Sequence, residues 1–234
     1  MKDWFPLTSY DFYAYLTGGM VVLAAIDHAF MGSVLANEIE WKVVAIVFWA
    51  AIAYLIGHIV AIPSSAILEH WLARRVLRDP SAIILGLHSQ RRRERCFATI
   101  VGAREYEPFP EDYRALIVTK LCWLMNVAEH NLKSDAAFQC AFPHARSVSD
   151  AAARMDNFLN QYGLCRNVSF ASGLATIFLT CFAVRTGQPI DIWLAVGASV
   201  LALGLFVRFI KFYAAYTREV FRAFDKTYVM PSAL

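Results

Sequence analysis

Apolar and polar positions follow two patterns along the chain. Four long stretches are almost wholly apolar, whereas the segments between and after them carry apolar residues at every third or fourth position. A helix needs about 20 residues, within a range of roughly 17 to 25, to cross the ~30 Å hydrocarbon core of a bilayer. The stretches of that length, which we predict to be transmembrane helices, are 13–35, 41–62, 168–184 and 190–210.

The connections between these stretches group them into two hairpins. A short acidic turn at 36–40 joins the first two, and 185–189, which contains Gly187 and Pro189, joins the last two. The long segment 63–167 separates the pairs.

The polar segments have the periodicity of amphipathic helices. In 66–78 the apolar residues recur every three or four positions until Asp79-Pro80, a helix-stop signal. No segment alternates in the manner of a strand. Further helices are predicted at 81–87, 111–130 and 148–162, with a loop at 102–110, and the fourth span is predicted to continue as a helix into 211–225.

These patterns predict an all-α integral membrane protein with four transmembrane helices in two hairpins and helical cytosolic extensions. Its predicted parts are a first transmembrane hairpin (1–66), a cytosolic helical region (67–167), a second transmembrane hairpin (168–210) and a cytosolic helical tail (211–234).

Composition supports a membrane protein. The chain is 58% hydrophobic and 18% charged, with a mean hydropathy of +0.44, whereas soluble domains average about 25% charged residues. The first residues pair one cation, Lys2, with Asp3, and no small-residue cleavage site follows a short apolar core. We therefore expect the first span to be retained.

The basic residues predict the orientation. Of the 22 Lys and Arg residues, only Lys42 and Arg185 lie in or directly beside the two hairpin turns. Because basic residues next to spans stay in the cytosol, both termini and the middle segment are predicted to be cytosolic.

Two Arg clusters close to the second span are predicted to contact anionic lipid headgroups. Nucleic acid is a weaker interpretation, because the middle segment also carries eleven acidic residues. The residues of these clusters are Arg74, Arg75, Arg78, Arg91, Arg92, Arg93 and Arg95.

Asp27 and His28 are ionisable residues inside the first span. Such residues are costly in a bilayer and are therefore candidates for function. Asp27 precedes the predicted outer end by about eight residues, roughly 12 Å of helix rise. We predict pore lining or an assembly contact; the alternatives are a polar pair bonded to a neighbouring helix and a position near the outer headgroups.

His58 lies in the second span. Antiparallel pairing of the first two spans brings it close to Gly18 and Gly19, far from His28, so the two histidines are not expected to share a metal. Because small residues allow helix backbones to approach, Gly18, Gly19 and Gly57 are predicted to form a helix-packing contact. His58 is then either a hydrogen-bonding packing residue or, less favoured, a third candidate for pore lining or assembly.

No metal, cofactor or catalytic motif is evident. No two histidines have the i, i+4 spacing that places two ligands on one helix face, and Walker, GxGxxG, GxSxG and HExxH patterns are absent. The cysteines lack CxxC spacing and are predicted to be packing residues; they are Cys96, Cys122, Cys140, Cys165 and Cys181. We therefore predict no metal site and no cofactor.

Two stretches, 10–19 and 54–65, share features with a known group of proteins. They combine an aromatic–Asp entry at Tyr10-Asp11, a glycine early in the first span and a Gly57-His58 exit followed by serine. In this they resemble poorly characterised prokaryotic multi-span membrane proteins. Some of these look like membrane components of antiviral defence systems that form pores or sense membrane damage. The resemblance implies a location in the prokaryotic inner membrane.

Three hypotheses for function remain. The favoured one is a homo-oligomeric membrane effector or sensor, pore-forming in its most specific form, whose cytosolic helices receive a signal or a protein partner. The second is a membrane-embedded enzyme acting on a lipid or lipid-linked substrate. The third is a membrane anchor that recruits a soluble partner.

Overall fold

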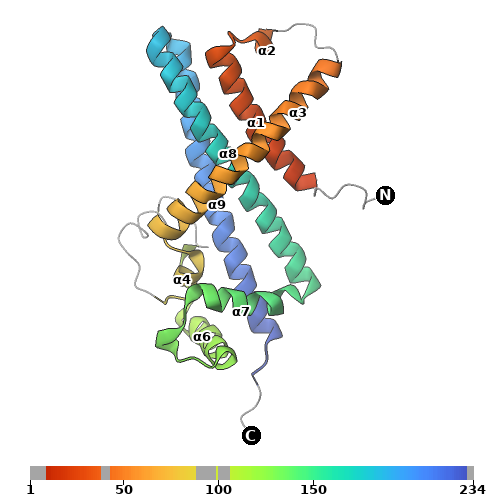
Figure 1. Ribbon diagram of the computed structural model, residues 1–234. Helices are drawn as coiled ribbons and strands as arrows, with labels where there is room; N and C mark the ends of the chain where they lie inside the picture. The colour runs from red at the N-terminus through yellow and green to blue at the C-terminus, as the bar shows by residue number, and fades with distance from the viewer. Residues whose placement is uncertain (1–8, 38–42, 88–98, 100–105, 231–234) are drawn as a thin grey trace. The chain divides into compact units, whose positions relative to one another are not determined.

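A computed structural model describes residues 9–37, 43–87, 99 and 106–230 (Figure 1). All regular secondary structure in these residues is helical, and they contain no strand. The prediction of an all-α protein is thereby confirmed.

Four helices are long and apolar enough to cross a membrane. They carry the four apolar stretches singled out above, and α8 and α9 are much longer than a bilayer requires. These helices are α1 (Ser9–Phe30), α3 (Val43–Ser64), α8 (Ser149–Thr186) and α9 (Pro189–Thr227).

The first long helix ends earlier than predicted. α1 stops at Phe30, five residues before the predicted end at Leu35, and a short helix α2 (Val34–Asn37) follows. Gly32 and Ser33 both have positive φ, +68° and +60°, which an α-helix cannot accommodate. A hydropathy profile cannot predict this turn, because the residues on both sides of it are apolar.

The second long helix continues beyond its apolar stretch. α3 is followed without a break by η1 (Ser65–Val76), a π-helix. Pro63 lies just before the change, and the i→i+5 pattern ends with Leu77 N–H donating to the carbonyl of Leu72 at 3.0 Å. Proline has no N–H for the α-helical ladder, so an altered hydrogen-bond register next to it is expected.

The chain divides into two compact units. Unit 1 comprises residues 1–70 and 163–209, and unit 2 comprises 71–162 and 210–234. The boundaries fall within η1, α8 and α9, so each of these helices contributes one segment to each unit.

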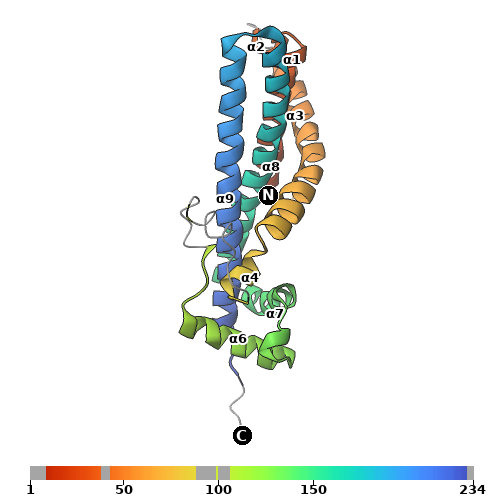
Figure 2. The same ribbon diagram turned by 90° about the vertical axis from the view of Figure 1, so that its left-hand side faces the viewer.

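Unit 1 contains two pairs of packed helices. α1 and α3 cross closely at Gly19, Ala53 and Gly57 (Figure 1). The unit 1 segments of α8 and α9 run side by side (Figure 2), with Ser169 Oγ donating to the carbonyl of Ala202 at 2.8 Å.

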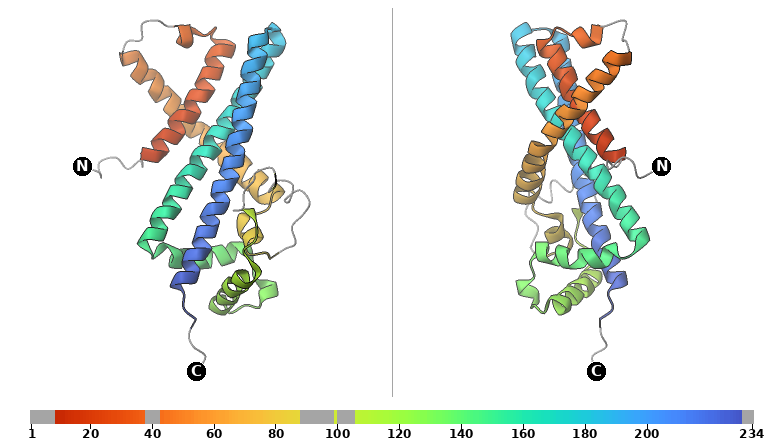
Figure 3. Two further views of the ribbon diagram at one scale, coloured as in Figure 1. Left: turned by 180° about the vertical axis from the view of Figure 1, so that it is seen from behind. Right: turned by 45° about the vertical axis from the view of Figure 1, so that its right-hand side comes forward.

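Unit 2 has a hydrophobic core to which most of its described helices contribute side chains. Its helices are α4 (Pro80–Ile84), α6 (Glu111–Met125), the short η3 (Glu129–Asn131) and α7 (Ser134–Arg146), together with segments of α8 and α9 (Figure 3). The largest fully buried side chains of this core are Ile84, Leu85, Ile117, Leu121, Met155, Val220, Phe221 and Phe224.

Two helices of unit 2 differ from the predictions. α6 ends at Met125, five residues before the predicted end, because the next residue, Asn126, adopts the left-handed conformation that asparagine tolerates. α7 was not predicted. It buries Ala137, Ala141 and Ala145, whose small side chains give a weak apolar signal, and Pro143 near its end resembles a breaker.

Candidate functional site

Asp27 holds the turn that ends α1. Its main-chain carbonyl accepts from the N–H groups of Met31 and Ser33, both at 3.0 Å, and its carboxylate oxygen Oδ1 accepts from Leu35 N–H at 3.0 Å. The side chain is 3% exposed. Since α1 ends only three residues later, the predicted distance of eight residues between Asp27 and the helix end is wrong.

His28 connects this turn to the start of α9. Its Nε2 lies 2.8 Å from Asp191 Oδ1, and its Nδ1 lies 3.1 Å from Ser33 Oγ. The imidazole packs edge-on against the ring of Phe182 in α8, with centroids 5.4 Å apart. The His28 side chain is 29% exposed, whereas that of Asp191 is 4% exposed, so the pair is accessible only from the histidine side.

Asp191 is fixed on its other side. Thr186 Oγ1 donates to Asp191 Oδ2 at 2.5 Å, and the Asp191 N–H donates to the carbonyl of Gln188 at 3.2 Å. An acid in the first turn of a helix is favoured by the helix dipole. We call Ser33, His28, Asp191 and Thr186, with Asp27 supporting the turn, the His28 cluster.

Three members of the His28 cluster, Ser33, Thr186 and Asp191, were missed in the sequence. A usable signal existed, because Pro189 at the first helical position and Asp191 in the first turn are typical of a helix start. That pattern predicts an acidic residue at the beginning of the fourth span. If this end of the fourth span lies next to the end of the first, the acid lies near His28.

His58 and the three glycines lie at two different contacts. Gly19 and Gly57 occupy the crossing of α1 and α3, where a Cβ on Gly57 would overlap the carbonyl oxygen of Tyr15. Gly18 instead faces α8, with Ala171 Cβ 3.7 Å from the position of a Cβ. His58 stacks on Tyr15 with ring centroids 4.0 Å apart and an interplanar angle of 27°. His58 therefore packs beside the crossing of α1 and α3, and this position does not place it in contact with His28.

A second polar network lies at the other end of unit 1. Arg166 Nη1 donates to Glu69 Oε2 at 2.7 Å, and the Arg166 carbonyl accepts from Ser64 Oγ at 3.2 Å. The two charged side chains are only 16% and 11% exposed, and Asn167 beside them is 4% exposed. This ion pair connects η1 to α8. From the sequence, Arg166 and Glu69 were considered only as part of the charge distribution and were not singled out as a pair.

The predicted headgroup-contact residues are only partly described. Arg74 and Arg75 are exposed on η1, and Arg78 is half-buried with a φ of +69°. The remaining four, Arg91, Arg92, Arg93 and Arg95, lie outside the described residues.

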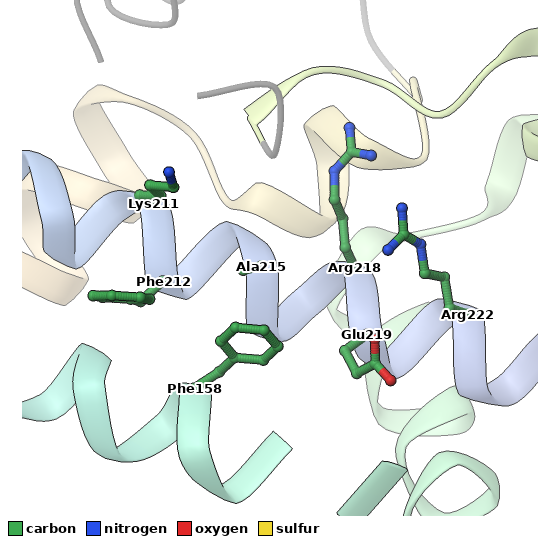
Figure 4. A pocket seen from close by; sticks show the side chains of 7 residues that line it. All are labelled: Phe158, Lys211, Phe212, Ala215, Arg218, Glu219 and Arg222. Carbon is green, nitrogen blue, oxygen red and sulfur yellow. The ribbon is translucent and has the colours of Figure 1, made fainter. Parts of the chain in front are cut away.

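Unit 2 has a basic groove of about 250 Å³ along α9 (Figure 4). Arg218 donates to the carbonyls of Glu107 and Pro108 and lies 5.0 Å from the ring centre of Phe109. Glu219, the acid in the lining, accepts from Arg154 Nε at 2.8 Å. The groove lining is Phe158, Lys211, Phe212, Ala215, Arg218, Glu219 and Arg222.

This lining is suited to a ligand that is both anionic and partly apolar. Lys211 and Arg222 are exposed, and Figure 4 shows both reaching to the same side of α9, with Phe158 on the other side. The cations can bind phosphate and the aromatic rings can cover an apolar group.

The thiols of Cys122 and Cys140 in unit 2 are half-buried. Burial raises the pKa of Cys122 and of Cys140, so both thiols stay protonated at neutral pH and are poor nucleophiles. Nearby, burial and the Asp225 carboxylate raise the pKa of Tyr113 to about 12. Among the described residues, no three His, Cys, Asp or Glu side chains gather as a metal site; Cys96 lies outside them.

No protein-family model matches the chain, and no curated protein or solved structure matches it either. The resemblance to prokaryotic membrane proteins therefore rests on its two short stretches. The side chains of Tyr10 and Asp11, which begin the first stretch, lie outside the described part of the chain.

Proposed function

We propose that this chain is a homo-oligomeric, multi-span effector or sensor of the prokaryotic inner membrane, with both termini and unit 2 in the cytosol. Its cytosolic helices receive a signal or a protein partner, and its spans respond by forming or gating a pore. Antiviral defence is the biological setting that the resemblance suggests.

The observation that supports assembly is the bare surface of α9. Only 11% of the apolar 18-residue stretch of α9 is buried, whereas 44% of the corresponding stretch of α8 is buried. Gly197 and Gly204 lie seven residues apart on this surface, and a Cβ on either would meet no atom within 4 Å. Small residues on one helix face allow a second helix to approach closely, so we assign this face to contact between copies.

Bulky substitutions on this face are expected to break the oligomer. The variant carrying Gly197→Leu and Gly204→Leu should associate at least tenfold more weakly, a loss of about 1.4 kcal/mol, because leucine side chains hold the helices apart. Single-molecule photobleaching in liposomes measures the subunit number directly. Gly173→Leu on α8, where a Cβ also meets open space, is the control. A monomeric wild type, or equal assembly of both variants, would contradict the proposal.

A pore is tested by dye leakage from liposomes that contain the purified protein. Wild type is expected to release a small dye, and Asp27→Ala to release much less, because the substitution removes the buried carboxylate that accepts from Leu35 N–H in the turn after α1. Retention of dye by wild-type vesicles that contain confirmed oligomers would exclude the pore and leave the enzyme and anchor hypotheses.

The basic groove supports membrane lipids as partners of unit 2. Lys211 directly follows the fourth predicted span, and one basic side chain near an anionic surface contributes about 1 kcal/mol. Lys211→Glu should therefore weaken binding of short-chain phosphatidylglycerol to the detergent-solubilised protein about fivefold or more. Lys226→Glu makes the same charge change at an exposed position of α9 outside the groove and should have little effect. Equal losses in both variants would contradict specific binding.

A further inference from the structure

The His28 cluster contains the three groups of a serine nucleophile site in hydrogen-bonded order. Asp191 Oδ1 lies 2.8 Å from His28 Nε2, and Ser33 Oγ lies 3.1 Å from His28 Nδ1. Hydrogen bonding of one imidazole nitrogen to a carboxylate fixes the proton on that nitrogen. Nδ1 is then left with its lone pair directed at the Ser33 hydroxyl, which is the arrangement that activates a serine.

The carboxylate is held as an orienting group. The Asp191 side chain is only 4% exposed, and its second oxygen accepts from Thr186 Oγ1. A carboxylate fixed in this way keeps the imidazole in one tautomer and stabilises the imidazolium that forms when a proton is taken up.

Ser33 has an unusual backbone conformation. Its φ is +60° directly after Gly32 at +68°, and the turn is over-determined by Asp27, which accepts from the N–H groups of Met31, Ser33 and Leu35. A residue other than glycine in this region costs free energy and persists only where neighbours enforce it. The enforced conformation keeps the hydroxyl beside His28.

The surroundings of Ser33 indicate the substrate. Phe30, Met31 and Val34 flank it with side chains that are 65%, 39% and 54% exposed. Three exposed apolar side chains beside a nucleophile at the end of a membrane helix suit an acyl chain.

We propose that Ser33, His28 and Asp191 form an acyl-ester hydrolase site for a lipid substrate. The Ser33 oxygen attacks the ester carbonyl while His28 Nδ1 takes the hydroxyl proton. The carbon–oxygen bond to the alcohol breaks, and the leaving alcohol receives that proton. Water then attacks the acyl-serine, gives a proton to His28, and releases the fatty acid as Ser33 regains its proton. Ser33 and His28 are the catalytic residues, and Asp191 is a positioning residue.

A fluorophosphonate probe tests the nucleophile on the full-length protein in detergent. Wild type should be labelled, with the adduct mapped to Ser33 by peptide mass spectrometry. Ser33→Ala and His28→Gln should abolish labelling, whereas Ser147→Ala, which removes a hydroxyl bonded to the His144 carbonyl in unit 2, should label like wild type. Ser33→Gly is a second variant that preserves the turn, because glycine adopts a positive φ without strain.

The positioning role of Asp191 has its own readout. Asp191→Asn should slow labelling by at least roughly a hundredfold and move the pH at which labelling reaches half its maximum, and a merely structural change would not move that pH. Folded wild type that is not labelled, or labelling that persists in folded Ser33→Gly, would overturn the proposal.

A chromogenic ester series then tests the substrate class. Hydrolysis of p-nitrophenyl esters should increase from acetate to octanoate, and Ser33→Gly should remove it. Equal turnover across chain lengths would overturn the lipid assignment. These assays depend on neither sidedness nor subunit number, so their failure would leave the proposed oligomer untouched.

Discussion

Gly19→Ala is expected to destabilise the packing of α1 and α3 strongly, whereas Gly18→Ala, one residue earlier, should be nearly neutral. A Cβ on Gly19 would overlap the carbonyl oxygen of Ala53 and lie 2.9 Å from the Gly57 nitrogen. Both are backbone atoms of α3, so the helices must separate. The cost is expected to be about 3 kcal/mol or more, at the upper end of overpacking.

Gly18 provides a matched control on the same helix. The nearest atoms to a Cβ there are Ala171 Cβ at 3.7 Å and the Asn167 carbonyl oxygen at 3.8 Å, which are ordinary contacts. The thermal midpoint in detergent should fall by about 6 to 12 °C for Gly19→Ala and change little for Gly18→Ala. Similar midpoints for the two variants would mean that α1 and α3 do not cross at Gly19.

Arg166→Gln is expected to cost about 3 to 5 kcal/mol, because it leaves the buried Glu69 carboxylate without its 2.7 Å partner. Such a cost arises from an uncompensated buried charge and not from the loss of an attractive interaction alone. The double variant Glu69→Gln with Arg166→Gln should therefore recover part of the stability lost in the single variant.

An exposed ion pair in the same chain provides a comparison for the stability lost when a buried ion pair is broken. Arg146 and Asp156 lie 3.1 Å apart with side chains 47% and 49% exposed, so Arg146→Gln should cost at most about 1 kcal/mol. Chemical denaturation of the detergent-solubilised variants gives both values. A double variant less stable than Arg166→Gln would contradict the burial argument.

The helical spans could be predicted because their signal is local. Twenty apolar residues in succession specify a membrane-length helix wherever the rest of the chain lies, and the all-α assignment and the four long helices were obtained in this way. The continuation of α9 beyond its span was also predicted, because no breaker follows Arg208. The alanine-faced helix α7 was not, since alanine gives almost no amphipathic contrast.

The helix ends were less predictable because they depend on backbone conformation. The positive φ of Gly32 and Ser33 ends α1 within an apolar stretch, and the αL conformation of Asn126 ends α6. Neither turn is marked by a change in the hydropathy of the neighbouring residues, so hydropathy could not predict where these helices end.

The sequence alone singled out Asp27 and His28, because an ionisable residue in an apolar stretch is conspicuous. Their partners were decided by tertiary structure. His28 bonds to Asp191 across 163 residues of sequence, and Arg166 bonds to Glu69 across 97. Hydropathy and periodicity are properties of neighbouring residues, whereas a hydrogen bond between distant residues depends on how helices cross and where each one ends. The sequence therefore determined the helices and the unusual charges, and only the packing of those helices decided which polar groups meet.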